Sequence, residues 1–244
     1  MSFYLPLGDD RFRPTKSTES PWDTEMQHGG PPAALLGHLL SVDGQRLARI
    51  SVDFLGPIPR KDFRVEVSPL KPGRLTTLNE AHMIIDGRTA VIARAWHIAP
   101  GPQPPTITET TTADPLPAEA SVFFPEKPDW GYGQAIEWRA TDKTRIWTRV
   151  KHALIDGTDL TGQDRALIIA DSANGISAVL PLDKWLSIPP TMSTALLRAP
   201  AGEWVHLSCR TALSDDGLGL CTGELYDAEG ALGQVTQPLV VRAR

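Results

Sequence analysis

Cysteine, positive charge and long apolar runs are all scarce in this sequence. Cys209 and Cys221 are too few and too far apart for a metal knuckle or a redox pair, so we expect buried thiols in a reducing compartment. The formal net charge of −5 at pH 7 argues against a nucleic-acid partner. No apolar run approaches the roughly 18 residues of a membrane span, and Met1 to Pro6 lacks the features of a secretory signal. We therefore expect a cytosolic protein that binds neither nucleic acid nor a membrane.

Several catalytic signatures are missing as well. The sequence has no Gly-x-Ser-x-Gly elbow of the α/β-hydrolases, and no His-Glu-x-x-His or clustered Cys/His set that would bind zinc. Gly217-Leu218-Gly219 resembles part of a dinucleotide fingerprint, but it follows Asp215-Asp216, which indicates a hairpin turn. We expect neither a metal nor a cofactor.

The most informative stretch runs from Trp22 to Leu40. Gly29 and Gly30 let the backbone turn sharply and approach a neighbour closely. Two prolines follow, which the first turn of a helix tolerates, and then a nearly all-apolar run. This predicts the N-terminus of a buried helix, which offers free N–H groups and a partial positive charge to an anion. The alternative is a tight turn before an ordinary core helix.

The rest of the first half is typical of antiparallel strands. Apolar and polar residues alternate over 46–54 and again over 63–68, which is the pattern of half-buried strands. Residues 75–85 and 89–98 flank Asp86-Gly87, a strong hairpin signal. The composition, with 41% hydrophobic and 22% charged residues, is that of an ordinary globular protein, and the length permits one large domain or two halves of about 120 residues.

A proline- and threonine-rich segment, 99–133, separates residues 1–98 from residues 134–244. We expect a linker draped over the surface, with a lid or partner arm as the alternative. The second half then repeats the layout of the first. Its expected elements are strands over 135–140 and 146–154, an apolar helix over 162–180, and strands over 193–198, 204–212, 218–226 and 231–242. Two matching halves predict a duplicated α+β unit, each copy a helix cradled by a curved antiparallel sheet.

Taken together, these motifs resemble the double-hotdog acyl-CoA thioesterases, specifically the type II group. The residues that carry the resemblance are Trp22 and 27–36 in the first half, and 170–175, 198–204, 225–227 and Gln237 in the second. The resemblance implies an α+β double hotdog, two tandem hotdog repeats in which a curved antiparallel sheet wraps each central helix. It also implies hydrolysis of acyl-CoA thioesters at a site in the C-terminal repeat.

The catalytic set of that family is an Asp on the helix, a Thr or Ser on the following strand and a Gln on the last strand. The resemblance carries the Asp to Asp171 and the Gln to Gln237. The hydroxyl position aligns with Pro189, which has no hydroxyl. We expect Thr191 to replace it, because residues two apart on a strand share a face, with Ser193 two residues further on.

The residues themselves give partial independent support. Asp171 lies in the middle of the expected apolar helix, where a charge is costly unless it is paired, and Asn174 lies over the same helix face. Gln237 shares its strand face with Val235 and Leu239, so its amide needs a buried partner. The alternatives are a solvated helix edge for the Asp and an ordinary core amide for the Gln.

These groups predict thioester hydrolysis without a metal or a covalent nucleophile. The carboxylate, amide and hydroxyl orient a water for attack on the carbonyl, and N–H groups of a helix N-terminus meet the oxyanion. A thiol leaves readily as thiolate, so a strong general acid is not essential. We expect His28, Gly29, Gly30 and Asn174 to contact the substrate, with a structural role as the alternative for His28.

Two functions remain open at this stage. The first is an acyl-CoA thioesterase. The alternative is a non-catalytic acyl-thioester-binding protein, or a repurposed biosynthetic hotdog protein, that has lost the hydroxyl at Pro189. Either CoA or a carrier protein could bear the acyl group. By analogy with other hotdog proteins we expect a homo-oligomer.

Overall fold

The structure of the chain is a computed structural model that describes residues 1–108, 111–124 and 127–244. The elements of the first half are β1 (Ser2–Gly8), β2 (Arg11–Pro14), the short 3-10 helix η1 (Lys16–Thr18), α1 (Gly30–Leu39), β3 (Arg46–Phe54), β4 (Phe63–Lys71), β5 (Thr76–Ile85) and β6 (Arg88–Ile98). Those of the second half are α2 (Gly131–Gln134), β7 (Ile136–Ala140), β8 (Arg145–Val150), β9 (Ala153–Ile155), α3 (Gly162–Ala170), α4 (Ala173–Ile176), β10 (Trp185–Ile188), β11 (Thr191–Leu196), β12 (Trp204–Leu213), β13 (Leu218–Asp227) and β14 (Gly230–Ala243).

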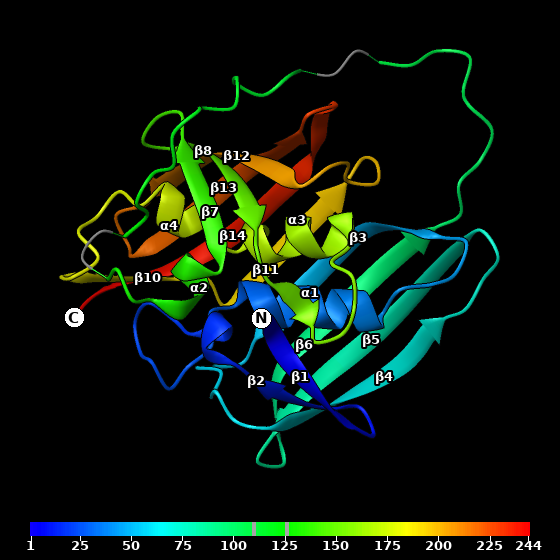
Figure 1. The fold of residues 1–244 in the computed structure, drawn as a ribbon, viewed down its shortest axis with the longest axis horizontal. Coiled ribbons are helices and arrows are strands. Elements are labelled where there is room, and N and C mark those ends of the chain that lie inside the picture. The colour runs from blue at the N-terminus through cyan, green and yellow to red at the C-terminus, as the bar shows by residue number, and fades with distance from the viewer. Residues whose placement is uncertain (109–110, 125–126) are drawn as a thin grey trace.

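One sheet runs through both halves of the chain. Its strand order is β7-β8-β12-β13-β14-β11-β3-β6-β5-β4-β2-β1-β9, with β10 paired to β14. The halves join where β3 pairs antiparallel with β11, from Asp53 opposite Thr191 to Arg49 opposite Ala195, and where β1 pairs parallel with β9. The longest helices, α1 and α3, lie at the centre of the molecule among the strands of the two halves (Figure 1).

Local sequence signals of the first half are confirmed. The predicted helix begins at Gly30, with Pro31 and Pro32 in its first turn, and its apolar side chains from Pro31 to Leu36 are buried. The expected hairpin joins β5 to β6 through Asp86 and Gly87, whose φ angles of 49° and 76° are those of a two-residue turn that glycine and aspartate tolerate.

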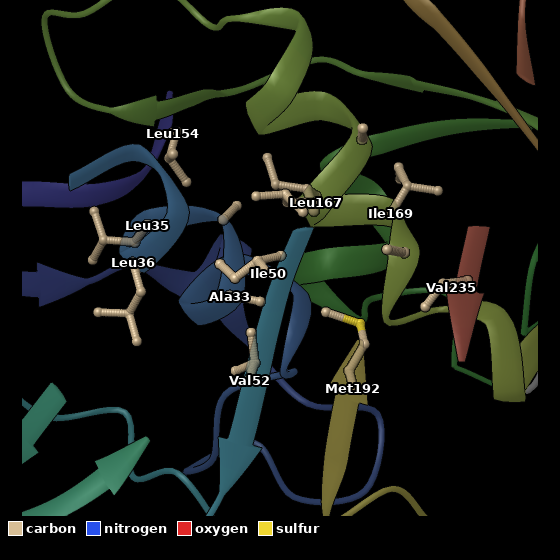
Figure 2. Packing of buried hydrophobic residues seen from close by; sticks show 14 of the residues in the cluster. Ala33, Leu35, Leu36, Ile50, Val52, Leu154, Leu167, Ile169, Met192 and Val235 are labelled. Atoms are coloured by element: carbon tan, nitrogen blue, oxygen red, sulfur yellow. The ribbon is translucent and has the colours of Figure 1, made fainter. Parts of the chain in front are cut away.

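Glycines let α1 and α3 approach closely. A Cβ added at Gly30 would lie 2.1 Å from the carbonyl oxygen of Ile168, and one added at Gly37 would lie 2.5 Å from a methyl group of Leu167. Because the neighbours are a backbone atom and a packed core side chain, a larger residue would force the helices apart. Figure 2 shows Ala33 of α1 and Leu167 of α3 beside Ile50 of β3, and these residues belong to one buried core.

The prediction of one long helix over 162–180 is wrong. The structure has α3, which begins with a capping box between Thr161 and Asp164 and ends at Ala170, and then the short α4. Asp171 is therefore the C-terminal cap of α3, not a mid-helix residue. Asp171 and Ser172, both weak helix formers, lie between the two helices.

Residues 99–130 contain no helix or strand in the part that the structure describes, in agreement with the composition of this segment. Its end is nevertheless packed into the protein body. Phe123 stacks on Trp138 with ring centroids 4.4 Å apart, and the buried Trp130 donates its indole N–H to the carbonyl oxygen of Glu19 at 2.6 Å. The domain limits at residues 98 and 134 stay predictions.

Other strand limits also differ from the expectation. The strand predicted over 146–154 is two strands, β8 and β9, and β10 was not foreseen. No helix in the described ranges is long and apolar enough to cross a membrane.

Candidate active site

A largely apolar cavity of about 560 Å³ opens where the turn before α1, the end of β3, the α3–α4 junction and β10 meet. Such a volume falls within the range of small-molecule sites. Its apolar and aromatic lining residues are Trp22, Met26, Phe54, Leu55, Ile58, Phe123, Phe124, Trp130, Leu182, Leu186, Ile188 and Val240.

Few ionisable groups face this cavity. Among the lining residues that the structure describes, they are Asp23, His28, Asp171 and Arg244. Asp23 and Arg244 are exposed, whereas Asp171 is only 6% exposed. A buried carboxylate beside an apolar cavity is the arrangement in which a carboxyl group can serve as a base near neutral pH.

The structure brings together two residues that the sequence predicted, Asp171 and Gln237. The amide of Gln237 donates from Nε2 to Oδ1 of Asp171 at 3.0 Å, and its Oε1 accepts from the backbone N–H of Asn174 at 3.2 Å. Gln237 lies on the inner face of β14, as its strand parity predicted, and is fully buried. The amide therefore fixes the orientation of the carboxylate.

The glycine turn also holds this carboxylate. The backbone N–H groups of Gly29 and Gly30, at the N-terminus of α1, face the carboxylate of Asp171 and lower its pKa. A Cβ at Gly29 would lie 2.7 Å from Oδ2 of Asp171 and 2.8 Å from Phe54, so this approach requires glycine. The anion that the helix N-terminus binds is thus a side chain of the protein itself.

The environment of Asp171 adjusts its pKa to the physiological range. Burial raises the pKa of this carboxyl from 3.8 to about 7, and the hydrogen bonds from Gly29, Gly30 and Gln237 limit the rise. A base is most effective when its pKa lies near the working pH, because it is then both available and strong enough to take a proton.

His28 lies beside the carboxylate with its ring firmly held. Its Nδ1 accepts a hydrogen bond from the N–H of Gly30 at 3.1 Å and lies 3.3 Å from Oδ2 of Asp171. The ring stacks on that of Tyr132, with centroids 3.9 Å apart and planes 13° from parallel. Burial lowers the pKa of His28 to about 3, so the imidazole is neutral and the contact with Asp171 is not an ion pair.

Asn174, another predicted contact residue, lines the cavity and connects its walls. Its Nδ2 donates to the carbonyl oxygen of Ser187 on β10 at 3.0 Å, while its backbone N–H holds Gln237. The side-chain amide therefore positions β10 against the α3–α4 junction.

The structure does not bring Thr191 to this site. Its hydroxyl donates to the carbonyl oxygen of Val52 at 3.0 Å, and it is not among the described residues that line the cavity. The buried face of β11 carries Met192, Thr194 and Leu196, so Thr191 points the other way. Pro189, the position to which the resemblance assigns the hydroxyl, does line the cavity.

Aromatic residues from the supposed linker were missed by the sequence interpretation. Phe123, Phe124 and Trp130 form one wall of the cavity, and the buried Tyr132 donates to the carbonyl oxygen of Ile168 at 2.8 Å while it supports His28. The signal was present, because large aromatic side chains are unusual in a segment that only drapes over a surface. Within the described ranges, no three His, Cys, Asp or Glu side chains are placed to hold a metal ion.

Solved structures with the same fold cover nearly the whole chain. A conserved protein of unknown function with a hot dog fold from Alicyclobacillus acidocaldarius matches with a TM-score of 0.75 and 16% identity over 98% of this chain and 96% of that one. The acyl-CoA thioesterase II TesB2 from Mycobacterium marinum matches with a TM-score of 0.68 and 14% identity over 99% and 96%. The tesB protein of Mycobacterium avium subs. paratuberculosis matches with a TM-score of 0.62 and 16% identity over 98% and 95%. At such low identity these matches show the hotdog fold alone.

Sequence comparison identifies the family. No curated protein sequence matches this chain. The family model of the acyl-CoA thioesterase N-terminal domain matches residues 18–98, and that of the acyl-CoA thioesterase C-terminal domain matches residues 98–241. The second match alone covers more than half of the 244 residues, so this chain belongs to the acyl-CoA thioesterase family.

Proposed function

We propose that the protein is a double-hotdog thioesterase that hydrolyses an acyl-CoA thioester, with Asp171 as the general base. The observation that carries this proposal is the buried carboxylate of Asp171, with its pKa raised to about 7, held by Gln237 beside an apolar cavity large enough for an acyl group. The family to which the chain belongs supports the thioester as substrate.

The reaction needs one water and one base. Ionised Asp171 accepts a proton from the water as the water oxygen bonds to the thioester carbonyl carbon, and the carbonyl π electrons move to oxygen. The tetrahedral oxyanion then re-forms the C=O bond and breaks the C–S bond. The thiolate takes up the proton held by Asp171, so that one thioester and one water give one carboxylic acid and one thiol. Gln237 keeps the carboxylate oriented throughout.

The proposed reaction has no step for a side-chain hydroxyl. Thr191 is bonded to Val52 on the other face of its strand, and Pro189 offers no hydroxyl to the cavity. The part that the family resemblance assigns to a Thr or Ser therefore has no occupant at its aligned position, and a role for Thr191 stays a prediction. Asp171, kept in place by Gln237, would hold the water alone.

Pro189 also favours a second candidate, an acyl-thioester-binding protein without turnover. Both candidates bind the acyl-thioester in the cavity, and they differ in whether Asp171 activates a water for hydrolysis. Within the first candidate, the choice between CoA and a carrier protein stays open. The cytosolic location and the homo-oligomer expected from the sequence also stay predictions.

The test is release of free thiol from a panel of acyl-CoAs with short to long chains, followed with a thiol reagent. Asp171→Asn should lower kcat at least a hundredfold with its fold retained, because general-base catalysis contributes roughly 10²- to 10⁴-fold. Gln234→Met, a change on the exposed face of the same strand as Gln237, is the matched control and should keep normal turnover. Binding of acyl-CoA without any thiol release would establish the second candidate.

A further inference from the structure

We propose that His28 is a further catalytic residue of this site, whose Nε2–H donates to the thioester carbonyl oxygen and to the oxyanion that forms there. The inference rests on the proposed thioesterase function, since the oxyanion arises only in that reaction. It assigns a hydrogen-bond donor to the carbonyl oxygen, which Asp171 and Gln237 do not supply.

The donors that the sequence offered for the oxyanion are occupied within the site. The N–H of Gly30 donates to Nδ1 of His28, and the N–H of Gly29 faces the carboxylate of Asp171. The backbone N–H of Asn174 donates to Oε1 of Gln237. A carbonyl oxygen that enters the cavity therefore needs a different donor.

The hydrogen bonds of His28 place its proton on Nε2. The N–H of Gly30 donates to Nδ1 at 3.1 Å, so Nδ1 presents its lone pair and carries no proton. A neutral imidazole has one N–H, which must then be on the other nitrogen. Burial lowers the pKa of His28 to about 3, so the ring keeps this form across the neutral range.

Nε2 is open to the cavity. His28 is one of its lining residues, and no described residue forms a hydrogen bond with Nε2. The buried ring nitrogens that lack a partner in the described part of the chain belong to His97 and His206, and Nε2 of His28 is not one of them. Because Nε2 of His28 has no partner among the described residues and is not enclosed by protein, it is accessible, and the space that the ring faces is the cavity.

The donor is also preorganised beside the base. The stack on Tyr132, the bond to Gly30 and the backbone bond from His28 to Thr18 at 2.7 Å fix the ring before any substrate binds. Nδ1 of the same ring lies 3.3 Å from Oδ2 of Asp171. A thioester whose carbonyl oxygen meets Nε2 therefore exposes its carbon next to the water held by the carboxylate. Fixed donors of this kind stabilise an oxyanion without reorganisation.

Two substitutions distinguish the effect of losing the Nε2–H donor from the effect of losing the aromatic ring. His28→Phe retains an aromatic ring for Tyr132 and removes the N–H, whereas His28→Gln replaces the ring by an amide that can donate from a similar place. We expect His28→Phe to lower kcat for acyl-CoA hydrolysis by roughly 10²- to 10³-fold with little change in KM. His28→Gln should recover at least tenfold of that loss. His82→Gln, at a half-exposed histidine that pairs with Glu80 away from the cavity, is the control and should have normal kcat.

Equal losses of kcat in His28→Phe and His28→Gln, or a change in KM alone, would overturn the proposal. A second measurement needs no change at His28 and no turnover. In Asp171→Asn, the proton NMR signal of the His28 Nε2–H should move downfield when acyl-CoA is added. An unchanged signal with acyl-CoA bound would also overturn it. Failure of wild-type hydrolysis would refute the proposed function instead, and the NMR result would still decide whether His28 donates to the carbonyl oxygen of bound acyl-CoA.

Discussion

The pH dependence of hydrolysis should depend directly on the hydrogen bond between Gln237 and Asp171. This bond lowers the pKa of the carboxyl, whereas burial raises it, and the balance lies at about 7. In the wild type, kcat/KM should therefore rise about tenfold per pH unit below pH 7 and level off above pH 8. An aspartate with an ordinary pKa of 3.8 would give a flat profile over the same range.

Gln237→Met removes the amide and keeps a side chain of similar length in the buried position. Hydrogen bonds to charged groups contribute about 1.5–3 kcal/mol, and one pKa unit corresponds to about 1.4 kcal/mol. Loss of the bond should therefore raise the pKa of Asp171 by about one to two units. At pH 7, where half of the wild-type carboxyl is ionised, the variant should be roughly 5- to 50-fold slower than wild type, and most of this loss should disappear by pH 9.

The assay is thiol release from the best acyl-CoA between pH 5.5 and 9.5, with spontaneous hydrolysis subtracted at each pH. Gln234→Met controls for a change of the same type on the exposed face of β14 and should leave the inflection near pH 7. A Gln237→Met profile with its inflection at or below that of wild type would refute the reasoning. So would a flat wild-type profile above pH 6, because Asp171 would then not be the titrating base.

Three further predictions concern stability and the glycine turn. Because folding raises the pKa of Asp171 from 3.8 to about 7, its ionised form destabilises the fold by up to about 4 kcal/mol above pH 7 and not at all below pH 3.8. Asp171→Asn should thus raise the free energy of unfolding in urea more at pH 8 than at pH 5, and equal gains would contradict this. Gly29→Ala should lower kcat/KM at least tenfold in the thiol-release assay with the fold retained, since its Cβ would lie 2.7 Å from Oδ2 of Asp171; normal activity would show that the turn adjusts freely. His38, in the last turn of α1, donates from Nδ1 to the carboxylate of Asp164 at 3.1 Å, and this bond raises the pKa of His38. The resulting stabilisation is full below pH 6.5 and is lost as the pH rises through the folded-state pKa. His38→Gln should therefore reduce the urea midpoint more at pH 6 than at pH 9, and a reduction independent of pH would exclude the ionic contribution.

Signals that act over a few residues were sufficient to predict much of this protein. The glycine and proline pattern before Leu40 determined where α1 begins, and Asp86-Gly87 determined the hairpin between β5 and β6. Alternation along β14 placed Gln237 on the buried face. These features follow from backbone sterics and from the two-residue period of a strand, which a sequence states directly.

The position of Thr191 shows why the strand face of Pro189 does not predict the face of residues that follow the two prolines. Ile188 on β10 pairs with Val240, whereas Ser193 on β11 pairs with Thr236. Between these two pairs, the segment that joins β10 to β11 contains one residue more than the facing part of β14. The extra residue falls at Pro189–Pro190, between the two strands. A shift of one residue moves every following side chain to the opposite face, and Thr191 turned away from the cavity.

What the sequence determined by itself was the presence of the buried carboxylate, the amide and the glycine turn. Only the tertiary structure decided how they are combined: the glycine turn faces Asp171, and the ring of His28 lies beside the same carboxylate. These partners lie more than a hundred residues apart in the chain. Their contact depends on the close packing of α1 against the end of α3. A pattern of neighbouring residues in the sequence does not specify how closely two helices pack.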